Sequence, residues 1–297
     1  MKIFIVGSLN MDLVIKAPYM PENGETLSGD SFMTNPGGKG ANQATAVGKL
    51  GGNAYMVGCV GEAFGEELKN TLNGYNVKTD FVNKVQGVSS GIAVIVVVDG
   101  DNRIILDAGA NAKVDQEIID KALSSANKGD YLVCQLEIPQ ESVLYALKKG
   151  KEKGMVTVLN PAPAKELLPN ILGYCDYFIP NQSEAKFYTG ILPEDDASAK
   201  ACAQKLQETG VENVIITMGT KGSVYIGKEG IIKVNSFKVE AIDTTAAGDT
   251  FVGALVTRLS EGASVEQSMT FASKASSITV TRRGAQQSIP FRKEVNV

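Results

Sequence analysis

The chain has 297 residues, of which 43% are hydrophobic and 21% are charged, and this balance is ordinary for a globular enzyme and argues against disorder. The length is long for one minimal domain and short for two full ones, so we expect one large core with a small appendage. The net charge of -4 gives no reason to expect nucleic acid or an anionic membrane as a partner.

The first predicted element is a strand at Lys2–Val6, which ends at Gly7. This apolar run is far too short for the core of a signal peptide or for a membrane-spanning helix. No stretch of about 18 apolar residues occurs elsewhere, so we expect a cytoplasmic protein without a membrane partner.

Short apolar runs and helical segments alternate along the rest of the chain. Strands are predicted where the runs end in polar or glycine-rich turns, at Tyr131–Gln135, Thr157–Leu159, Tyr177–Ile179 and Val214–Thr217. Helical spacing and length are found at Ala41–Leu50, Glu141–Lys153 and Ser198–Thr209. This alternation predicts an α/β fold with a mostly parallel sheet covered by helices on both faces. Ligands of such sheets bind at the carboxyl ends of the strands, so the residues after each strand are candidates for a site.

Two segments interrupt this alternation. Residues 11–35 hold short strand-like pieces separated by prolines and a glycine. Residues 89–108 predict a hairpin, with one strand at Ile92–Val98, a turn at 99–102 and a second strand at Arg103–Asp107. We expect the two segments to form a small projecting β-sheet, while the α/β core comprises residues 1–10, 36–88 and 109–297.

The sequence contains no histidine, which excludes every Ser-His or Cys-His mechanism and every histidine-ligated metal. Its four cysteines, Cys59, Cys134, Cys175 and Cys202, form no CxxC pair and match no zinc spacing. We interpret them as small buried apolar residues. If the chain is an enzyme that uses general-base catalysis, its base is therefore expected to be a carboxylate.

The strongest motif is Asp243-Thr-Thr-Ala-Ala-Gly-Asp249, which precedes a helical run over residues 250–259. The small residues at 246–248 allow a ligand to approach the backbone closely, and their amide groups would lie at a helix N-terminus, where anions bind. Asp249 would then lie beside the anion. The alternative is that Asp249 only caps the helix and complements its dipole. The adjacent small residues and the second aspartate favour the anion site.

Two earlier turns carry polar side chains that suit a polyhydroxylated ligand. Pro36-Gly-Gly-Lys-Gly-Ala-Asn42 opens a helix but matches neither a P-loop nor a dinucleotide fingerprint, and its lysine and asparagine would donate to hydroxyls. Gly7-Ser-Leu-Asn-Met-Asp12 follows the first strand, and its asparagine and aspartate can bind hydroxyls as donor and acceptor. The alternatives are an ordinary glycine turn and an Asx turn, respectively.

Two later turns also follow predicted strands. Asn181-Gln-Ser-Glu184 has the spacing of a capping box, but the same residues could organise Mg²⁺ through water. Spacing alone does not separate these two interpretations, and both can hold. Thr217-Met-Gly-Thr-Lys-Gly222 follows a β-branched strand and suits contact with a phosphate, with an ordinary glycine turn as the alternative.

These five features, in this order, resemble the ribokinase-like (PfkB) carbohydrate kinase family. The resemblance covers nearly the whole chain, and it implies an ATP-dependent sugar kinase. Its most specific pieces are GGKGANQA at 37–44 and DTTAAGDTF at 243–251. It extends to GSLNMD at 7–12, DAGAN at 107–111, NPAPA at 160–164 and RRGAQQS at 282–288.

The resemblance implies a role for each motif. Asp249 would be the catalytic base that deprotonates the primary hydroxyl of the sugar. The anion hole for the γ-phosphate of ATP would be formed by Ala246, Ala247 and Gly248. The sugar would be held by Asn10, Asp12, Gly38, Lys39, Gly40, Ala41, Asn42 and Glu137. The nucleotide site would be lined by Asn181, Thr217, Gly219, Thr220, Lys221, Gly222, Gly248 and Ser273.

The resemblance also implies two metal ions. Mg²⁺ would be organised by Asn181 and Glu184, largely through water. A monovalent cation, K⁺ by preference, would lie against Asp243, Ser288 and the carbonyl groups of Thr245, Thr279, Arg282 and Gly284. The sequence departs from the family pattern at Ala246, where many members have glycine, and at Ser273, where some have histidine.

The expected reaction is the ATP-dependent phosphorylation of D-ribose at its 5-hydroxyl. Ionised Asp12 and Glu137 can only accept hydrogen bonds, so each needs a sugar hydroxyl as donor. Met11 should point away from its neighbours on an extended segment, so no apolar residue matches a 2-deoxy position. The projecting sheet would close over the sugar as a lid and would pair with a second subunit, giving a homodimer.

Two kinds of alternative are kept. The chain could phosphorylate 2-deoxyribose, fructose or a nucleoside on the same fold. It could also be a non-catalytic sugar-binding regulator, but Asp249 beside an anion hole argues against a regulator, because binding alone needs no base.

Overall fold

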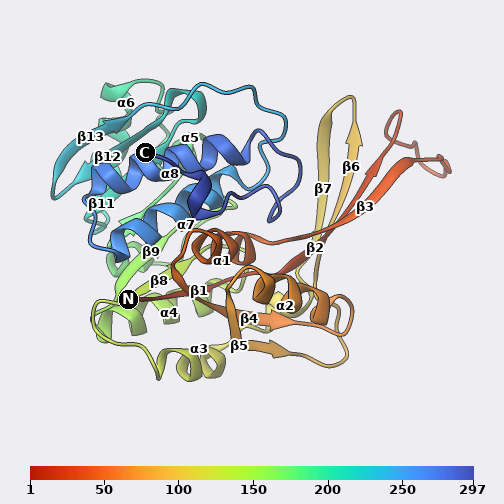
Figure 1. Cartoon of the computed structure of the whole chain (residues 1–297), viewed down its shortest axis with the longest axis horizontal. Helices are drawn as coiled ribbons and strands as arrows, with labels where there is room; N and C mark the ends of the chain where they lie inside the picture. Colours follow the sequence, from red (N-terminus) through yellow and green to blue (C-terminus); the bar gives the residue numbers. More distant parts are fainter.

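A nine-stranded sheet forms the centre of the chain, whose computed structural model describes residues 1–297. Its strands lie in the order β13-β12-β11-β10-β9-β8-β1-β4-β5 (Figure 1). All neighbours from β11 to β5 are parallel, and only β12 and β13 pair antiparallel, so the predicted mostly parallel sheet is confirmed. The strands are β1 Lys2–Val6, β4 Asn53–Val60, β5 Lys78–Lys84, β8 Tyr131–Cys134, β9 Val156–Leu159, β10 Tyr177–Phe178, β11 Asn213–Thr217, β12 Ser223–Gly227 and β13 Gly230–Val234.

Helices cover both faces of this sheet, as predicted (Figure 1). One face is covered by α1 (Lys39–Lys49), α2 (Gly65–Gly74), α7 (Ala247–Ser260) and α8 (Val265–Thr279). The other is covered by α3 (Gln116–Leu123), α4 (Gln140–Glu152), α5 (Gln182–Thr189) and α6 (Asp196–Gln207). Short 3-10 helices lie at η1 Gly109–Lys113, η2 Ile171–Tyr174, η3 Gly219–Lys221 and η4 Arg292–Glu294. None of the helices combines the length and the apolar character that a membrane span needs.

Strand β1 shows why the sheet sits between two helical layers. Ile3 and Ile5 pack into the core on one face, and Phe4 and Val6 pack into the core on the other. All four side chains are fully buried. Successive side chains of a strand point to opposite faces, so a strand that is covered on both sides needs a continuous apolar run.

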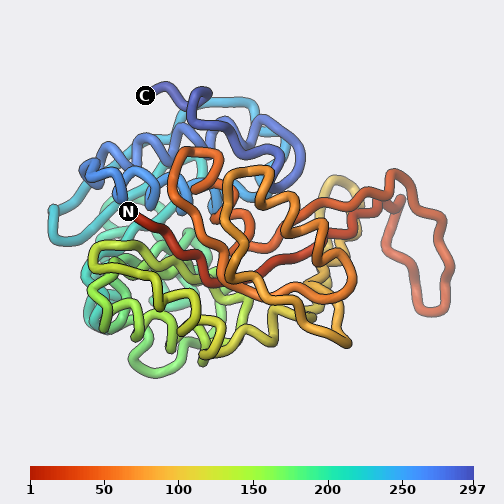
Figure 2. The backbone as a smooth tube through the Cα atoms, turned by 60° about the horizontal axis from the view of Figure 1, so that its bottom comes forward, coloured from red at the N-terminus to blue at the C-terminus, as the bar shows by residue number.

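A separate four-stranded sheet projects from the core (Figures 1 and 2). Its order is β3-β2-β6-β7, and the central pair β2 and β6 is parallel while the two outer pairs are antiparallel. Figure 2 shows the connection between β2 and β3 farthest from the core. The strands are β2 Asn10–Lys16, β3 Asp30–Gly37, β6 Gly91–Val98 and β7 Asp101–Asp107.

The hairpin between β6 and β7 has a tighter turn than the sequence predicts. Only Asp99 and Gly100 form the turn, and β7 starts at Asp101 rather than at Arg103. Asp99 has a φ of 52° and Gly100 a φ of 83°. Two residues with positive φ give the turn whose twist matches the flanking strands, and Asp-Gly is a favoured pair for it.

The four cysteines are free and buried, as expected. Burial, assisted by the charge of Asp115, raises the pKa of the Cys59 thiol to about 12. A thiol in such surroundings is neither a nucleophile nor a metal ligand at neutral pH.

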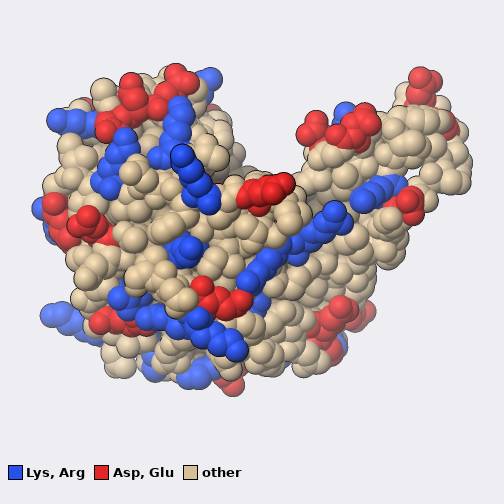
Figure 3. Space-filling model, turned by 45° about the horizontal axis from the view of Figure 1, so that its top comes forward, with Lys and Arg blue, Asp and Glu red and all other residues tan.

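The predicted site residues gather at one edge of the central sheet. Most of them follow β1, β8, β10 and β11 at their carboxyl ends or belong to the turns before α1 and α7, whereas Ser273 lies on α8 and residues 279–288 lie at its end and after it. On the face in Figure 3, a broad hollow separates the core from the projecting sheet, and basic and acidic side chains are interspersed around it.

Candidate active site

Asp249 lies in the first turn of α7 and is buried. The helix begins at Ala247 after Ala246, whose backbone is left-handed with a φ of 59°, and it has no side-chain cap. Asp249 Oδ2 accepts a hydrogen bond from Asn42 Nδ2 at 2.9 Å, and Oδ1 accepts one from Gln43 Nε2 at 3.0 Å. The carboxylate therefore binds side chains of α1 and does not serve as the cap of its own helix.

Asp249 and Lys39 stabilise each other's charged forms. Burial raises the pKa of the Asp249 carboxyl above its ordinary value, while the charge of Lys39 and the amide donors of Asn42 and Gln43 act in the opposite direction. Burial also opposes the charge on Lys39, but the surrounding carboxylates, led by Asp249, outweigh burial and raise the pKa of the lysine. The site therefore combines a buried carboxylate with a lysine that stays protonated.

The turn before α1 packs against the segment that follows β1. Gly38 has a φ of 89°, and a Cβ atom there would lie 2.7 Å from Asn10 N and 2.9 Å from Ser8 O. Only glycine fits this conformation and this approach. Glu137 Oε2 accepts hydrogen bonds from Lys39 N at 3.0 Å and from Ser8 Oγ at 2.6 Å. Its other oxygen makes no hydrogen bond to the protein and is available to a ligand.

Asn10 and Asp12 lie on β2, next to this turn. Asn10 Oδ1 accepts a hydrogen bond from Asn111 Nδ2 at 2.7 Å, so the Asn10 amide keeps its N–H groups for a ligand. Burial, and then the charge of Glu137, raise the pKa of Asp12 to about 7. Asn111 was not predicted as a site residue, although it lies in the stretch DAGAN at 107–111.

A cavity of about 210 Å³ lies at the N-terminus of α7. Its lining includes the predicted site residues Lys39, Asn181, Glu184, Thr217 and 246–249. It also includes Asn160, Ala162, Ile179, Thr244 and Val252, which were not predicted. The first two belong to the stretch NPAPA, which directly follows β9 at the carboxyl edge of the sheet, so their position after a strand was the available signal.

Asn181 and Glu184 form the predicted capping box at the start of α5. Asn181 Oδ1 accepts from Glu184 N at 2.8 Å, and Glu184 Oε2 accepts from Asn181 N at 2.8 Å. Both residues also line the cavity. Burial raises the pKa of Glu184, although its hydrogen bond from Asn181 and the charge of Lys39 act against this rise. Capping uses one Glu184 oxygen and leaves the other free.

The predicted nucleotide residues after β11 do not line this cavity, apart from Thr217. Lys221 Nζ donates to Glu194 O at 3.0 Å, so the ammonium group is directed to the loop before α6. Gly222 has a φ of 93°, and a Cβ atom there would lie 2.1 Å from Val234 O. Gly222 is thus required by its packing against β13. Ser273 is half-buried on α8, and Gly219 and Thr220 belong to η3.

Asp243 joins two segments that are far apart in the sequence. Its Oδ1 accepts from Thr245 N at 2.9 Å, and its Oδ2 accepts from Gly284 N at 2.9 Å. Partial burial opposes the charge, but the hydrogen bonds from Thr245 and Gly284 outweigh it and lower the pKa of Asp243. In the second segment, Ser288 Oγ donates to Ala285 O at 2.6 Å and Arg282 pairs with Glu294 at 2.7 Å.

The fold and this site together define a class of protein. A carboxylate beside a helix N-terminus and a protonated lysine, at the carboxyl edge of a parallel sheet, suit the transfer of a phosphoryl group to a hydroxyl. The chain belongs to the pfkB family of carbohydrate kinases, since the model described as "pfkB family carbohydrate kinase" matches residues 1–292.

The relatives of this chain include sugar kinases of two kinds. It is 39% identical over 293 residues to a ribokinase from Haemophilus influenzae, covering 98% of this chain and 95% of the relative. It is 36% identical over 299 residues to a deoxyribokinase from Salmonella typhimurium, covering 100% of this chain and 98% of the relative. The structure of Arabidopsis thaliana ribokinase complexed with ribose and ATP matches with a TM-score of 0.92 and 32% identity, over 99% of this chain and 97% of the other.

Proposed function

We propose that this carbohydrate kinase transfers the γ-phosphoryl group of ATP to the 5-hydroxyl of D-ribose, giving D-ribose 5-phosphate. The observation that carries the proposal is the buried Asp249 carboxylate, which lines one cavity with Lys39 at the N-terminus of α7. The ribokinases of Haemophilus influenzae and Arabidopsis thaliana, the second solved with ribose and ATP, support ribose and ATP as the substrates.

Asp249 is the proposed catalytic base. It accepts the proton of the 5-hydroxyl while the hydroxyl oxygen bonds to the γ-phosphorus and the bond to ADP breaks. Each Asp249 oxygen receives a single amide donor, so lone pairs remain for the hydroxyl. Lys39 stabilises the negative charge that develops on the transferring group.

The N-terminus of α7 supplies the proposed anion hole. The N–H groups of Ala246, Gly248 and Asp249 make no backbone hydrogen bond, whereas Ala247 N donates to Thr244 O at 3.2 Å. The three free N–H groups lie at the positive end of the helix and can stabilise phosphate oxygens. The sequence placed the anion hole at residues 246–248. The free N–H groups favour residues 246, 248 and 249 instead, because Ala247 N already donates to Thr244 O.

The polar residues of β2 and of the segment after β8 fit a sugar with several hydroxyls. Asn10 is left with N–H donors because Asn111 occupies its oxygen. Asp12 in its ionised form and the free Glu137 oxygen accept, so each needs a hydroxyl of the ligand. A ligand that lacks one of these hydroxyls leaves a buried partner unpaired, which costs about 1–3 kcal/mol.

Mg²⁺ is the proposed partner of the ATP phosphates. The site fits, because Glu184 has a free carboxylate oxygen of the kind that Mg²⁺ prefers, while Asn181, whose oxygen accepts from Glu184 N and Ser183 Oγ, would bind the waters of the ion through its N–H groups. No group of three metal-ligating acidic, cysteine or histidine residues is present, so the ion would be held mainly by phosphate oxygens and water. When bound, it would neutralise charge on the phosphates.

K⁺ is the proposed ion at Asp243. The site fits because Asp243 is anionic and lies where Thr245 and Gly284, two of the predicted carbonyl ligands, meet. Backbone carbonyl oxygens can replace the hydration shell of K⁺. Bound K⁺ would order the 282–288 segment, and through Thr245 it would act on the residues that precede α7.

A comparison of substrates under identical ATP, Mg²⁺ and K⁺ tests the function. We expect kcat/KM for D-ribose to exceed that for 2-deoxyribose by roughly ten- to hundredfold, and fructose and a nucleoside to be poorer still. The deoxyribokinase relative makes 2-deoxyribose the second candidate. If 2-deoxyribose equals or beats ribose, ribose is the wrong substrate while the kinase mechanism survives. If no sugar consumes ATP, the proposed function is wrong.

The projecting sheet is the proposed lid and dimer contact. It exposes large apolar side chains, among them Phe32 at 64%, Ile105 at 72% and Leu106 at 53%. Exposed apolar surface of this kind favours burial in an interface, and a second subunit would also cover the edge strands β3 and β7. Sedimentation should show a homodimer at micromolar concentration. A monomer would contradict this assignment.

A further inference from the structure

Gln43 is a fully buried amide on α1 whose two N–H groups and oxygen all make hydrogen bonds. Its Nε2 donates to Asp249 Oδ1 at 3.0 Å and to Asn160 Oδ1 at 3.0 Å. Its Oε1 accepts from Gln135 Nε2 at 2.7 Å. Gln43 therefore connects the first turn of α7 with the ends of β8 and β9.

The partners of Gln43 fix the direction of its amide. Gln135 directly follows β8 and is fully buried, and Asn160 directly follows β9 and donates to Ile179 O at 2.9 Å. Because Asn160 donates to a backbone carbonyl, its own oxygen faces Gln43, so both N–H groups of Gln43 face Asn160 and Asp249 and its oxygen faces Gln135. A reversed amide would place its oxygen against the Asp249 carboxylate. The chain of amides thus aims one permanent donor at Oδ1.

We propose that Gln43 is a positioning residue that fixes Asp249 Oδ1 and stabilises the ionised carboxylate before the sugar binds. A hydrogen bond to a carboxylate favours its charged form, and a donor held by two buried partners needs no reorganisation during the reaction. The inference rests on the proposed function in one respect, namely that Asp249 is the base.

Charged groups on four other segments also face Asp249. Lys39 on α1 favours its ionised form, and Glu137, after β8, disfavours it. Asp12 on β2 and Glu184 on α5 interact with it as like charges. Three carboxyl groups oppose the negative charge of Asp249, and one lysine favours it. The ionised form of Asp249 therefore depends on two neutral hydrogen-bond donors, the side-chain amides of Asn42 and Gln43.

The test is a titration of Asp249 that does not depend on turnover. The chain is labelled with carboxyl-¹³C aspartate, and Asp249 is assigned as the resonance that is missing in Asp249→Asn. Gln43→Glu replaces the donor by an acid of the same size, so two carboxyl groups then share one site. We expect the titration midpoint of Asp249 to rise by about one pH unit or more. Gln43→Met, which removes the donor without adding charge, should raise it less.

Gln204→Glu is the matched control, because it adds the same charge on the exposed side of α6. It should leave the Asp249 midpoint unchanged. In the active enzyme, the low-pH limb of the profile of kcat against pH should move to higher pH in both Gln43 variants, together with the titration midpoint of Asp249. KM for ribose should change by less than about threefold.

The inference is overturned if folded Gln43→Met and Gln43→Glu titrate like the wild type, or if kcat falls equally at every pH without a shift of the limb. The second result would mark Gln43 as merely structural. A failure of the proposed function is seen separately, since a chain that phosphorylates no sugar still gives the carboxyl titration.

Discussion

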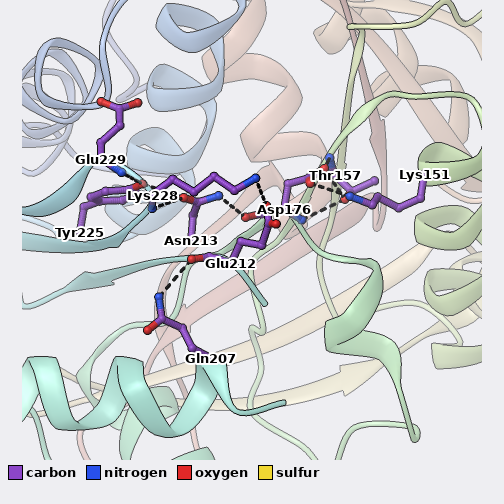
Figure 4. A network of polar contacts seen from close by, with 9 residues as sticks. All are labelled: Lys151, Thr157, Asp176, Gln207, Glu212, Asn213, Tyr225, Lys228 and Glu229. Carbon is purple, nitrogen blue, oxygen red and sulfur yellow. Dashed lines mark hydrogen bonds and ion pairs between the residues drawn. The ribbon is translucent and has the colours of Figure 1, made fainter. Parts of the chain in front are cut away.

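Two polar clusters lie at opposite edges of the same sheet, and each is built around an aspartate. At the amino edge, Asp176 precedes β10 (Figure 4). Its Oδ1 accepts from Lys151 Nζ at 2.6 Å, and its Oδ2 accepts from Thr157 N at 2.9 Å and Thr157 Oγ1 at 3.0 Å. Its carbonyl accepts from Asn213 Nδ2 at 2.8 Å, and Asn213 Oδ1 accepts from Tyr225 OH at 2.6 Å. The protein itself satisfies these groups.

The cluster around Asp249 at the carboxyl edge is incomplete by comparison. Asn42 Oδ1 and Gln135 Oε1 are buried there without a hydrogen-bond partner. Unpaired buried polar atoms are costly, and they are found where a ligand or water completes the site. One sheet thus carries aspartates in two settings: the half-buried Asp176 is satisfied by the protein at the amino edge, and the buried Asp249 at the carboxyl edge is proposed to serve a ligand.

The largest effect is expected from a substitution of Asp249. We expect Asp249→Asn to lower kcat by about 10²–10⁴, because the sugar hydroxyl loses its base. The free energy of unfolding should stay within about 1 kcal/mol of the wild type, because the Asn42 amide, whose oxygen has no partner, can reverse and accept from the new N–H group. Steady-state kinetics and urea denaturation check both parts, and a variant that keeps more than a tenth of kcat excludes Asp249 as the base.

Asp176→Asn is the matched substitution at the other edge. One of its oxygens becomes an amide nitrogen facing the donors of Thr157 or Lys151, so we expect a loss of about 1–3 kcal/mol in the free energy of unfolding. Lys151 is partly exposed and should contribute little to this loss. kcat should not change. A fall in kcat at full folding would show that the amino-edge cluster also serves the chemistry.

Asp12→Asn tests the carboxyl edge through the pH dependence of stability. The pKa of Asp12 is raised to about 7 by burial and by Glu137, so the carboxyl stabilises the folded chain at low pH and this contribution is lost as pH rises through about 7. Asparagine does not ionise. The variant should therefore gain about 1–3 kcal/mol in unfolding free energy relative to the wild type between about pH 5 and pH 8.

Denaturation at about pH 5 and about pH 8 measures this gain in unfolding free energy. KM for ribose should rise in the variant, because one accepting carboxylate oxygen is replaced by an amide nitrogen. An equal difference between variant and wild type at both pH values would contradict the raised pKa. With the predicted result, Asp12 lowers the stability of the folded chain near neutral pH and serves sugar binding. Such a role is expected at the carboxyl edge and not at Asp176.

The smallest effect is expected from the monovalent cation. At fixed ionic strength, replacing K⁺ by a bulky organic cation should lower kcat several-fold, and Asp243→Ala should remove most of this response. K⁺ should also raise the melting temperature of the wild type but not of the variant, since a ligand of the folded state stabilises it. Equal activity and equal melting temperature in both salts would contradict the K⁺ site.

The sequence predicted the fold and the motifs but not the contacts between them. The strands and helices that were predicted, and the projecting sheet, follow from apolar patterning, which is local, while β4, β5, β12 and β13 were not named. Asn111 holds Asn10 across 101 positions of the sequence, and Gln135 holds Gln43 across 92. Local spacing carries no information about such pairs, so these supporting amides were missed.

Other details differ because packing decides them. The ammonium of Lys221 bonds to the carbonyl of Glu194, and Gly222 packs against β13, so the turn after β11 serves the fold as well as any ligand. The hairpin turn was predicted too long because Asp101 and Asn102 are also turn-forming residues, but both pair with β6.

The chemical step itself gives the most direct test of Asp249 as the base. It can be followed by rapid quench of a single turnover of labelled ATP with saturating D-ribose, over a range of pH. In the wild type, the rate of phosphoryl transfer should fall as pH drops through the raised pKa of Asp249 and should level off above it. In Asp249→Asn the rate should be lower by about 10²–10⁴ and the acidic limb should be absent. A variant that keeps the acidic limb of the pH profile and more than a tenth of the wild-type rate would show that Asp249 is not the base.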